Sequence, residues 1–306
     1  MVAYKALTFK DFSQTIISLH QWSSNVNPKY VILICHGLAE HGTRYAPLAH
    51  YLAQKNCAVY AIDLRGHGLT SKETGLGIIG QTDSYHSLVK NINEAKSYIN
   101  ALHPDSLFIL LGHSMGSFLV QSAIQKDSSQ VAGLILSGTS IEPGLLLSFG
   151  KGLSRFLGLL FTMTSPSLLI KFIIFLPYIL PFIPYRSKYD WLCSVDQVVD
   201  DFLNDPLCNF RPSFQLFYAL FDVLDTIYKK ESLELIPKEL PILLFSGAED
   251  PLAKNQKALH KVVEKYHQTG HHRVQLKYYP KGRHEMLLEY NKEQVFSDIY
   301  TWLLSL

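Results

Sequence analysis

Six mostly apolar runs of strand length alternate with helical patterns along this 306-residue chain, which restricts the folds that it can adopt. Such runs are typical of strands that are buried on both faces of a sheet. They occupy residues 30–35, 57–62, 107–111, 134–136, 242–245 and 274–279. Helical patterns cover residues 45–54, 85–102, 115–125, 255–266 and 292–304. We therefore expect an α/β fold, a mostly parallel central sheet flanked by helices, with a leading antiparallel hairpin over residues 8–20.

The alternation stops between residues 140 and 238, where helical apolar stripes and proline-rich turns replace the strand runs. We interpret this stretch as a helical cap, or lid, inserted after the sixth strand, which is the run 134–136 when the two strands of the leading hairpin are counted. The expected division of the chain is an N-terminal part of the α/β core at residues 1–139, the cap at residues 140–238, and a C-terminal part of the core at residues 239–306.

The cap contains more apolar residues than a small domain needs for packing, with dense runs at 145–147, 156–161 and 172–176. Two explanations compete. Part of the stretch forms the wall of a long acyl pocket and also touches a lipid surface, or the apolar residues are simply the cap's own core. The strongest apolar stretch, 168–183, is short for a membrane span and is interrupted by Lys171, Pro177 and Pro181.

The overall charge gives no sign of a nucleic-acid partner, because the formal net charge is +2 and the basic residues are scattered. The four cysteines lack C-x-x-C spacing, and neither H-E-x-x-H nor a phosphate-binding glycine loop is present. We therefore expect no metal and no cofactor. Buried reduced thiols and the absence of a secretory pattern in residues 1–10 favour a cytoplasmic protein, with peripheral membrane contact through residues 145–182.

Gly112, Ser114 and Gly116 form a G-x-S-x-G motif between the strand run 107–111 and the helical pattern 115–125. α/β-hydrolases place a nucleophilic serine on such a strand-to-helix turn. The turn is sharp and strained, and side chains two residues before and after the serine would collide. Ser114 is therefore the candidate nucleophile.

A serine hydroxyl needs a histidine base, which a carboxylate holds in the right tautomer. In this fold the order along the chain is Ser, then Asp or Glu, then His. Asp250 lies on the loop after the run 242–245, and Pro251 suits the first turn of a following helix. Glu249 is the neighbouring alternative. His284 follows the last strand run and precedes the last helical pattern, so we expect a triad of Ser114, Asp250 and His284.

The oxyanion of a tetrahedral intermediate needs N–H donors that are already in place. The backbone N–H of Met115, the residue after the nucleophile, is one candidate. The second donor comes from the loop after the first parallel strand. Leu38 is the candidate there, because Gly37 lets the backbone turn toward the site. We expect four polar side chains to brace this loop rather than to perform chemistry: His36, Glu40, His41 and Arg44.

The segment 63–68, Asp-Leu-Arg-Gly-His-Gly, brings three chemically active side chains together after the second strand run. Because His67 precedes the serine, the usual triad order excludes it. We interpret the segment as a structural loop in which Asp63 and Arg65 bond to neighbouring backbone.

Five motifs together resemble the monoacylglycerol lipase and lysophospholipase family of serine hydrolases. They are His36-Gly-x-x-Glu40-His41-x-x-Arg44-Tyr45, Asp63-x-Arg65-Gly66-His67-Gly68, Gly112-x-Ser114-x-Gly116, Ser246-Gly-x-x-Asp250-Pro251 and Arg283-His284-Glu285. The segment 204–207, Asn-Asp-Pro-Leu, also resembles a cap motif of that family. Many members have a second glycine after the serine motif, where this chain has Ser117.

The resemblance implies the α/β-hydrolase fold and hydrolysis of carboxylic esters of lipids with one acyl chain, in a pocket that is roofed by a mobile cap and needs no cofactor. It implies Ser114, Asp250 and His284 as the triad, and Leu38 and Met115 as oxyanion donors. The alternatives are a small-ester carboxylesterase, a thioesterase or a peptidase on the same triad, and a non-catalytic lipid-binding protein. The cap sets the choice of head group and chain length, and only residues 204–207 of it can be aligned.

Overall fold

The computed structural model describes residues 1–24, 27–80, 85–142, 144–254 and 256–306. An eight-stranded sheet runs through the molecule in the order β1-β2-β4-β3-β5-β6-β7-β8. Its strands are β1 (Ala3–Lys10), β2 (Ile16–Ser23), β3 (Tyr30–Cys35), β4 (Cys57–Asp63), β5 (Leu107–His113), β6 (Val131–Ser137), β7 (Ile242–Gly247) and β8 (Val274–Tyr279). β2 pairs antiparallel with β1 and with β4, and all other neighbours are parallel. The expected mostly parallel α/β sheet is confirmed.

The six apolar runs correspond to β3 through β8. β3 and β8 have the expected bounds, and the other four strands extend beyond the runs at one or both ends. The leading hairpin is longer than the predicted stretch of 8–20, since β1 begins at Ala3 and β2 ends at Ser23. β1 is an edge strand with mostly exposed side chains, so its sequence lacks the apolar signal of a buried strand.

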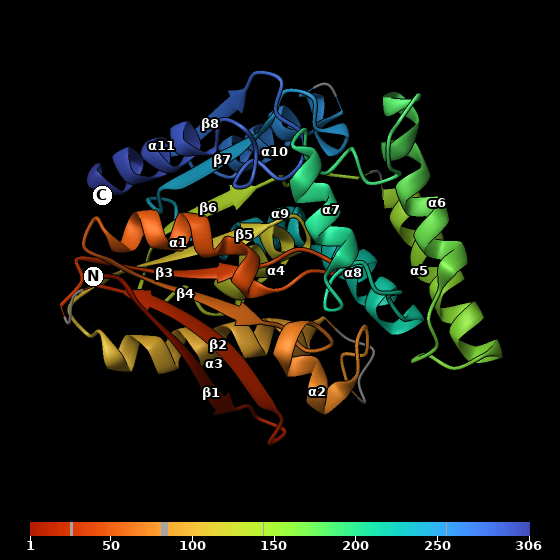
Figure 1. The fold of residues 1–306 in the computed structure, drawn as a ribbon, viewed down its shortest axis with the longest axis horizontal. Helices are drawn as coiled ribbons and strands as arrows, with labels where there is room; N and C mark the ends of the chain where they lie inside the picture. The colour runs from red at the N-terminus through yellow and green to blue at the C-terminus, as the bar shows by residue number, and fades with distance from the viewer. Residues whose placement is uncertain (25–26, 81–84, 143, 255) are drawn as a thin grey trace.

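Helices cover both faces of the sheet (Figure 1). α1 (Ala46–Ala53) and α11 (Lys292–Leu304) pack on one face. The other face is covered by α3 (His86–Leu102), α4 (Met115–Lys126), α8 (Phe214–Ile227) and α10 (Lys257–Gln268). On β3, Ile32 and Ile34 pack in the core under α1 and α11, whereas Val31 and Leu33 pack in the core on the opposite face. Burial on both faces explains why the runs of the inner strands are continuously apolar. The same burial was expected of β8, but β8 is an edge strand in which Gln275 and Lys277 are exposed, so that expectation was wrong. Asn255, the first residue of one predicted helix, lies outside the described residues.

Between β6 and β7 the chain forms α5 (Gly144–Leu160), α6 (Leu168–Ile179), α7 (Asp196–Asn204), α8 and α9 (Lys230–Leu233). α5 and α6 lie at the end of the molecule opposite the two termini (Figure 1). α8 packs against both the cap and the sheet. Its Phe217 and Phe221 pack with the cap, whereas Leu216 and Val223 join the core on the sheet. The helical insertion after the sixth strand is therefore present, and its exact domain boundaries stay a prediction.

The apolar residues of α5 divide into two groups. The inner group packs toward α8: Leu147 is buried, and Gly150 lies against the ring of Phe221. The outer group faces solvent, with Leu145 86% and Leu159 76% exposed. The cap's own core therefore accounts for only part of its apolar surplus. In the described part of the chain, no helix combines the length and the apolar character needed to cross a bilayer.

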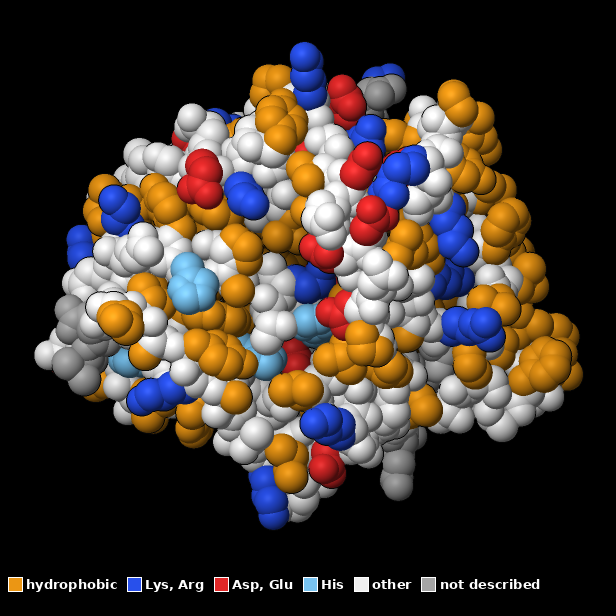
Figure 2. Space-filling view, viewed as in Figure 1, with side chains coloured by type: hydrophobic (Ala, Val, Ile, Leu, Met, Phe, Trp, Pro, Cys, Tyr) orange, Lys and Arg blue, Asp and Glu red, His pale blue; other side chains and the backbone are white. Residues whose placement is uncertain are grey.

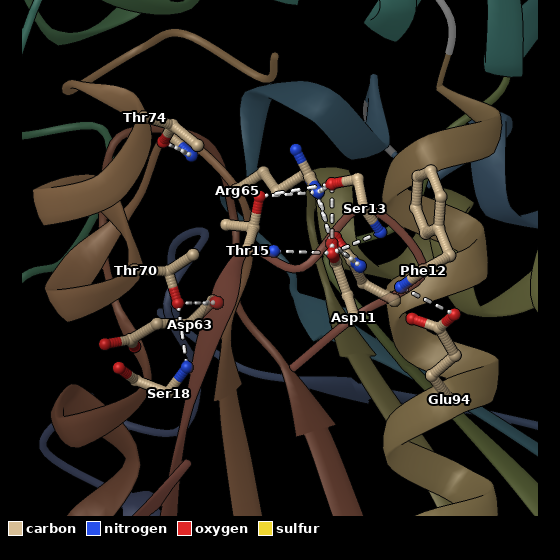
Figure 3. A network of polar contacts seen from close by, with 12 residues as sticks. Asp11, Phe12, Ser13, Thr15, Ser18, Asp63, Arg65, Thr70, Thr74 and Glu94 are labelled. Atoms are coloured by element: carbon tan, nitrogen blue, oxygen red, sulfur yellow. Dashed lines mark hydrogen bonds and ion pairs between the residues drawn. The ribbon is translucent and has the colours of Figure 1, made fainter. Parts of the chain in front are cut away.

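Asp63 and Arg65 fix the loop after β4 in different ways. The Asp63 carboxylate accepts backbone N–H groups of Gly42 at 2.8 Å and Leu69 at 2.7 Å, as expected. Arg65 instead reaches the β1–β2 turn, where its Nε donates to Asp11 Oδ2 at 2.9 Å (Figure 3). The prediction of backbone bonding was wrong for Arg65, because the long guanidinium side chain finds a charged partner distant in the sequence.

Candidate active site

Ser114 occupies the sharp turn between β5 and α4. Its backbone has φ 50° and ψ −120°, an unfavourable conformation for a residue with a side chain. A Cβ atom on Gly116 would lie 2.1 Å from the carbonyl oxygen of Cys35, and one on Gly112 would lie 2.4 Å from that of Gly116. The two glycines are therefore sterically required, and the strained turn expected from the motif is present.

Asp250 and His284 lie together at the ends of β7 and β8. His284 Nδ1 is 3.0 Å from Asp250 Oδ2, and both side chains are buried. The carboxylate also accepts hydrogen bonds from Ser246 Oγ at 2.6 Å and from the backbone N–H of Leu252 at 2.9 Å. The alternative acid, Glu249, is exposed. With Nδ1–H donated to Asp250, the Nε2 atom of His284 is left as the proton acceptor.

The electrostatics of this pair suit a base. Burial by itself lowers the pKa of His284, but the Asp250 carboxylate opposes it and the pKa lies above the usual 6.5. Burial favours a raised pKa for Asp250. The charge of His284 and the hydrogen bonds that the Asp250 carboxylate accepts nevertheless hold that pKa below its usual value. The ring of His113 lies 4.7 Å from that of His284. Burial and the neighbouring His284 lower the pKa of His113 to about 3, so His113 is neutral.

The loop after β3 packs directly against the serine. A Cβ atom on Gly37 would lie 3.2 Å from the Cβ of Ser114. Leu38 is the next residue of this loop, and Met115 is the first residue of α4. Within the described part of the chain, neither backbone N–H donates a hydrogen bond to another protein group. Both are therefore available to an oxyanion at Ser114.

Polar side chains brace this loop, as expected. Glu40 Oε1 accepts the backbone N–H of Gly37 at 2.6 Å, and His36 Nε2 accepts that of Leu64 at 3.1 Å. Arg44 Nη1 donates to Glu40 Oε2 at 2.6 Å. Burial favours a raised pKa for Glu40, but the charge of Arg44 and other neighbours lower the pKa to about 2. The loop is thus held by a permanent charge pair.

His41, Asp205 and Cys208 form the one group of described residues whose potential metal-ligating atoms all lie within 4.8 Å of one another. His41 Nε2 and Asp205 Oδ2 are already hydrogen-bonded at 2.8 Å. Burial raises the pKa of the Cys208 thiol, which disfavours the thiolate that a metal needs. Together with the bond from the N–H of Asn209 to the oxygen of Ala39 at 2.9 Å, these contacts fasten the cap to the loop after β3.

A cavity of about 290 Å³ opens beside Ser114. Ser114, His284 and Leu38 lie in its wall. Much of the remaining wall is apolar and comes from the cap, for example Leu147, Leu153, Ile174, Phe221 and Leu224.

Trp191 is a site residue that sequence reasoning missed. Its ring lies 5.2 Å from that of His284 and it lines the cavity. It belongs to the insertion, where no motif marks individual positions. The one available signal was the large number of apolar residues in that stretch.

An eight-stranded sheet with a nucleophile-type turn after β5 and an Asp–His pair after β7 and β8 defines an α/β-hydrolase. The comparisons with known proteins agree. Residues 26–291 match the family described as serine aminopeptidase, S33, and the chain belongs to that family.

Two curated relatives carry lipase names. The monoglyceride lipase of Mus musculus is 30% identical over 115 residues, 38% of this chain and 36% of the relative. The monoacylglycerol lipase of Mycolicibacterium smegmatis is 27% identical over 124 residues, 40% of this chain and 41% of the relative. The matches thus span less than half the length of these relatives. They confirm the resemblance to monoacylglycerol lipases.

A solved structure shows the same fold over nearly the whole chain. A thermostable carboxyl esterase from Bacillus coagulans, in complex with glycerol, superimposes with a TM-score of 0.90 at 24% identity. The alignment covers 99% of this chain and 98% of the esterase. The α/β-hydrolase fold is therefore confirmed.

Proposed function

We propose that this protein is a serine hydrolase that cleaves the carboxylic ester of monoacyl lipids, monoacylglycerols or lysophospholipids, through an acyl-enzyme on Ser114. The observation that carries this proposal is the cavity, which has Ser114 and His284 in its wall and apolar cap side chains around them. An apolar cavity with few polar groups suits one acyl chain with an ester at its end. The names of the lipase relatives support the same substrate class.

In this mechanism Ser114 Oγ attacks the ester carbonyl carbon while His284 Nε2 takes the hydroxyl proton. Asp250 keeps His284 oriented and stabilises its positive charge. The backbone N–H groups of Leu38 and Met115 bind the oxyanion. The bond from carbon to the alcohol oxygen then breaks, and His284 gives its proton to the leaving alcohol. Water, activated by the same histidine, releases the fatty acid.

The proposal includes a cap domain at residues 140–238, between core parts at 1–139 and 239–306, and a cytoplasmic protein that contacts membranes peripherally through the cap. Large apolar side chains are more than half exposed on α5 and α6: Leu145, Phe149, Phe156, Leu159 and Phe172. Figure 2 shows apolar side chains along the edge of the molecule where these helices lie. Contact with lipid removes such side chains from water. The four cysteines are free and buried, which suits a reducing compartment.

The deciding experiment measures initial rates on long-chain monoacylglycerols, lysophospholipids, short p-nitrophenyl esters, thioesters and an aminopeptidase substrate. The aminopeptidase substrate is included because the matched family is described as serine aminopeptidase, S33. We expect long-chain monoacyl esters to be preferred and Ser114→Ala to lower turnover about a millionfold. Near-normal turnover by this variant would refute the assigned nucleophile. Turnover of only short esters, thioesters or peptides would favour those activities, and lipid binding without turnover would indicate a binding protein.

A further inference from the structure

Lys171 on α6 places a positive charge in the cavity wall. Its Nζ donates to the backbone oxygens of Asn209 at 3.3 Å and Phe210 at 3.0 Å, and to Asn209 Oδ1 at 3.1 Å. All three acceptors are neutral. No carboxylate of the described residues forms an ion pair with Lys171. The other lysine in the wall, Lys254, is by contrast paired with Glu142 at 2.5 Å.

Two more cations belong to the same cluster. Lys171 Nζ lies 5.7 Å from the centre of the Tyr189 ring, and Lys188 Nζ lies 5.5 Å from the same ring. Arg211 follows Phe210, whose carbonyl oxygen binds Lys171. Lys188 and Arg211 are exposed, and neither is in an ion pair with a described residue.

The three charges are close enough to influence one another. Burial, together with the charges of Lys188 and Arg211, lowers the pKa of Lys171 to about 8. This mutual repulsion makes the cluster favourable for an anion, which would relieve it. Figure 2 shows Lys and Arg side chains on the cap side of the molecule, beside the apolar side chains of its outer edge.

The cluster is also connected to the reacting centre. Asn209, which accepts from Lys171, donates its backbone N–H to the oxygen of Ala39 at 2.9 Å. Ala39 is the neighbour of Leu38, the proposed oxyanion donor. In a monoacyl glycerophospholipid only the short glycerol unit separates the phosphate from the ester, and Lys171 lies in the wall of the same cavity as Ser114.

We propose that Lys171, Lys188 and Arg211 bind the phosphate head group of monoacyl glycerophospholipids, so that the enzyme prefers an anionic lysophospholipid to an uncharged monoacylglycerol with the same acyl chain. This inference rests on the proposed function and names its substrate class. Arginine and lysine are the side chains that bind phosphate through charge-assisted hydrogen bonds. Among the residues that the structure describes, no carboxylate is paired with Lys171, Lys188 or Arg211 and so competes with such a ligand.

The test compares kcat/KM for lysophosphatidic acid, lysophosphatidylcholine and monoacylglycerol that carry the same short acyl chain, each below its critical micelle concentration. We expect the anionic substrate to be preferred. The double variant Lys188→Gln/Arg211→Gln should lower kcat/KM for lysophosphatidic acid about tenfold, with little change for monoacylglycerol. Both side chains are exposed, so the fold should be kept.

Two further variants sharpen the comparison. Lys151, a cap lysine paired with Asp222 at 2.7 Å, provides the control Lys151→Gln, which should leave the substrate ratio unchanged. Lys171→Gln should reduce the preference further. Because this change also loosens Asn209, its effect on monoacylglycerol measures the structural part of the loss.

The outcomes separate the inference from the proposed function. Equal rates on charged and uncharged substrates, or an equal loss on both in the double variant, would overturn the head-group site while ester hydrolysis stands. A preference seen only with micelles or vesicles would also overturn it, because the cations would then act on a lipid surface. The absence of Ser114-dependent turnover on every monoacyl ester would instead refute the proposed function.

Discussion

Arg44 and Glu285 join the loop after β3 to the loop after β8 by two parallel hydrogen bonds, from Nη1 to Oε1 at 2.7 Å and from Nη2 to Oε2 at 2.8 Å. The Arg44 side chain is 10% exposed and that of Glu285 is 6% exposed. Arg44 also binds Glu40, which holds Gly37. Since Glu285 follows His284, one guanidinium fixes the proposed base relative to the proposed oxyanion loop.

Replacing this guanidinium should destabilise the fold strongly. Arg44→Met leaves the buried carboxylates of Glu40 and Glu285 without a cation, which we expect to lower the free energy of unfolding by about 3–5 kcal/mol. Urea unfolding followed by circular dichroism measures the change. Arg186→Met is the control, because the pair of Arg186 with Asp200 lies at the surface and should contribute little. Equal effects of the two variants would contradict the role given to Arg44.

The pH dependence of kcat/KM should reveal the charge of Asp250. His284 must be neutral to accept a proton, and its pKa is raised above 6.5. Activity should therefore fall as the pH decreases through a value above 6.5. In Asp250→Asn the residual activity should fall only at a lower pH, because the carboxylate that raises the pKa of His284 is gone. If activity falls at the same pH in the variant, the result would argue against the pairing of Asp250 with His284.

Alanine substitutions at two helical glycines should have opposite effects. Gly116→Ala puts a methyl group 2.1 Å from the carbonyl oxygen of Cys35, so the turn at Ser114 must move and activity should be lost. Gly152 on α5 has no neighbouring atom within 4 Å of an added Cβ. Gly152→Ala should therefore stabilise the protein by about 0.5–1 kcal/mol. Melting temperatures and ester hydrolysis test both, and a fully active Gly116→Ala protein would disprove the steric argument.

The outer face of the cap should control binding to lipid vesicles. Phe156→Ser with Leu159→Ser removes two exposed apolar side chains of α5, which should weaken vesicle binding about tenfold or more. Hydrolysis of a monomeric short-chain ester should be unchanged. Leu102→Ser, at the end of α3, is the control for general surface changes. Co-flotation with liposomes measures binding, and unchanged flotation of the double variant would exclude this face as the contact.

Local patterns predicted the positions of β3 to β8, including the partly exposed β8, but not the full extent of the leading hairpin. β3 is buried at every position and has the bounds expected from its apolar run. The β1–β2 hairpin was predicted too short because β1 is an exposed edge strand. Arg65 was assigned to neighbouring backbone, yet its partner Asp11 is 54 residues away. Errors of this kind arise because spacing and periodicity describe neighbours along the chain.

The order of the elements, the strained turn at Ser114 and a short list of candidates that includes Asp250 and His284 followed from the sequence. These features depend on local sterics and on the order of residues along the chain. The pairing of Arg44 with Glu285, 241 residues away, and the position of Trp191 beside His284 became visible in the folded structure. The structure was also needed to place Lys171 in the wall of the cavity beside Ser114, where it forms no ion pair with a described carboxylate. Such contacts form where distant segments pack together, and no local pattern specifies them.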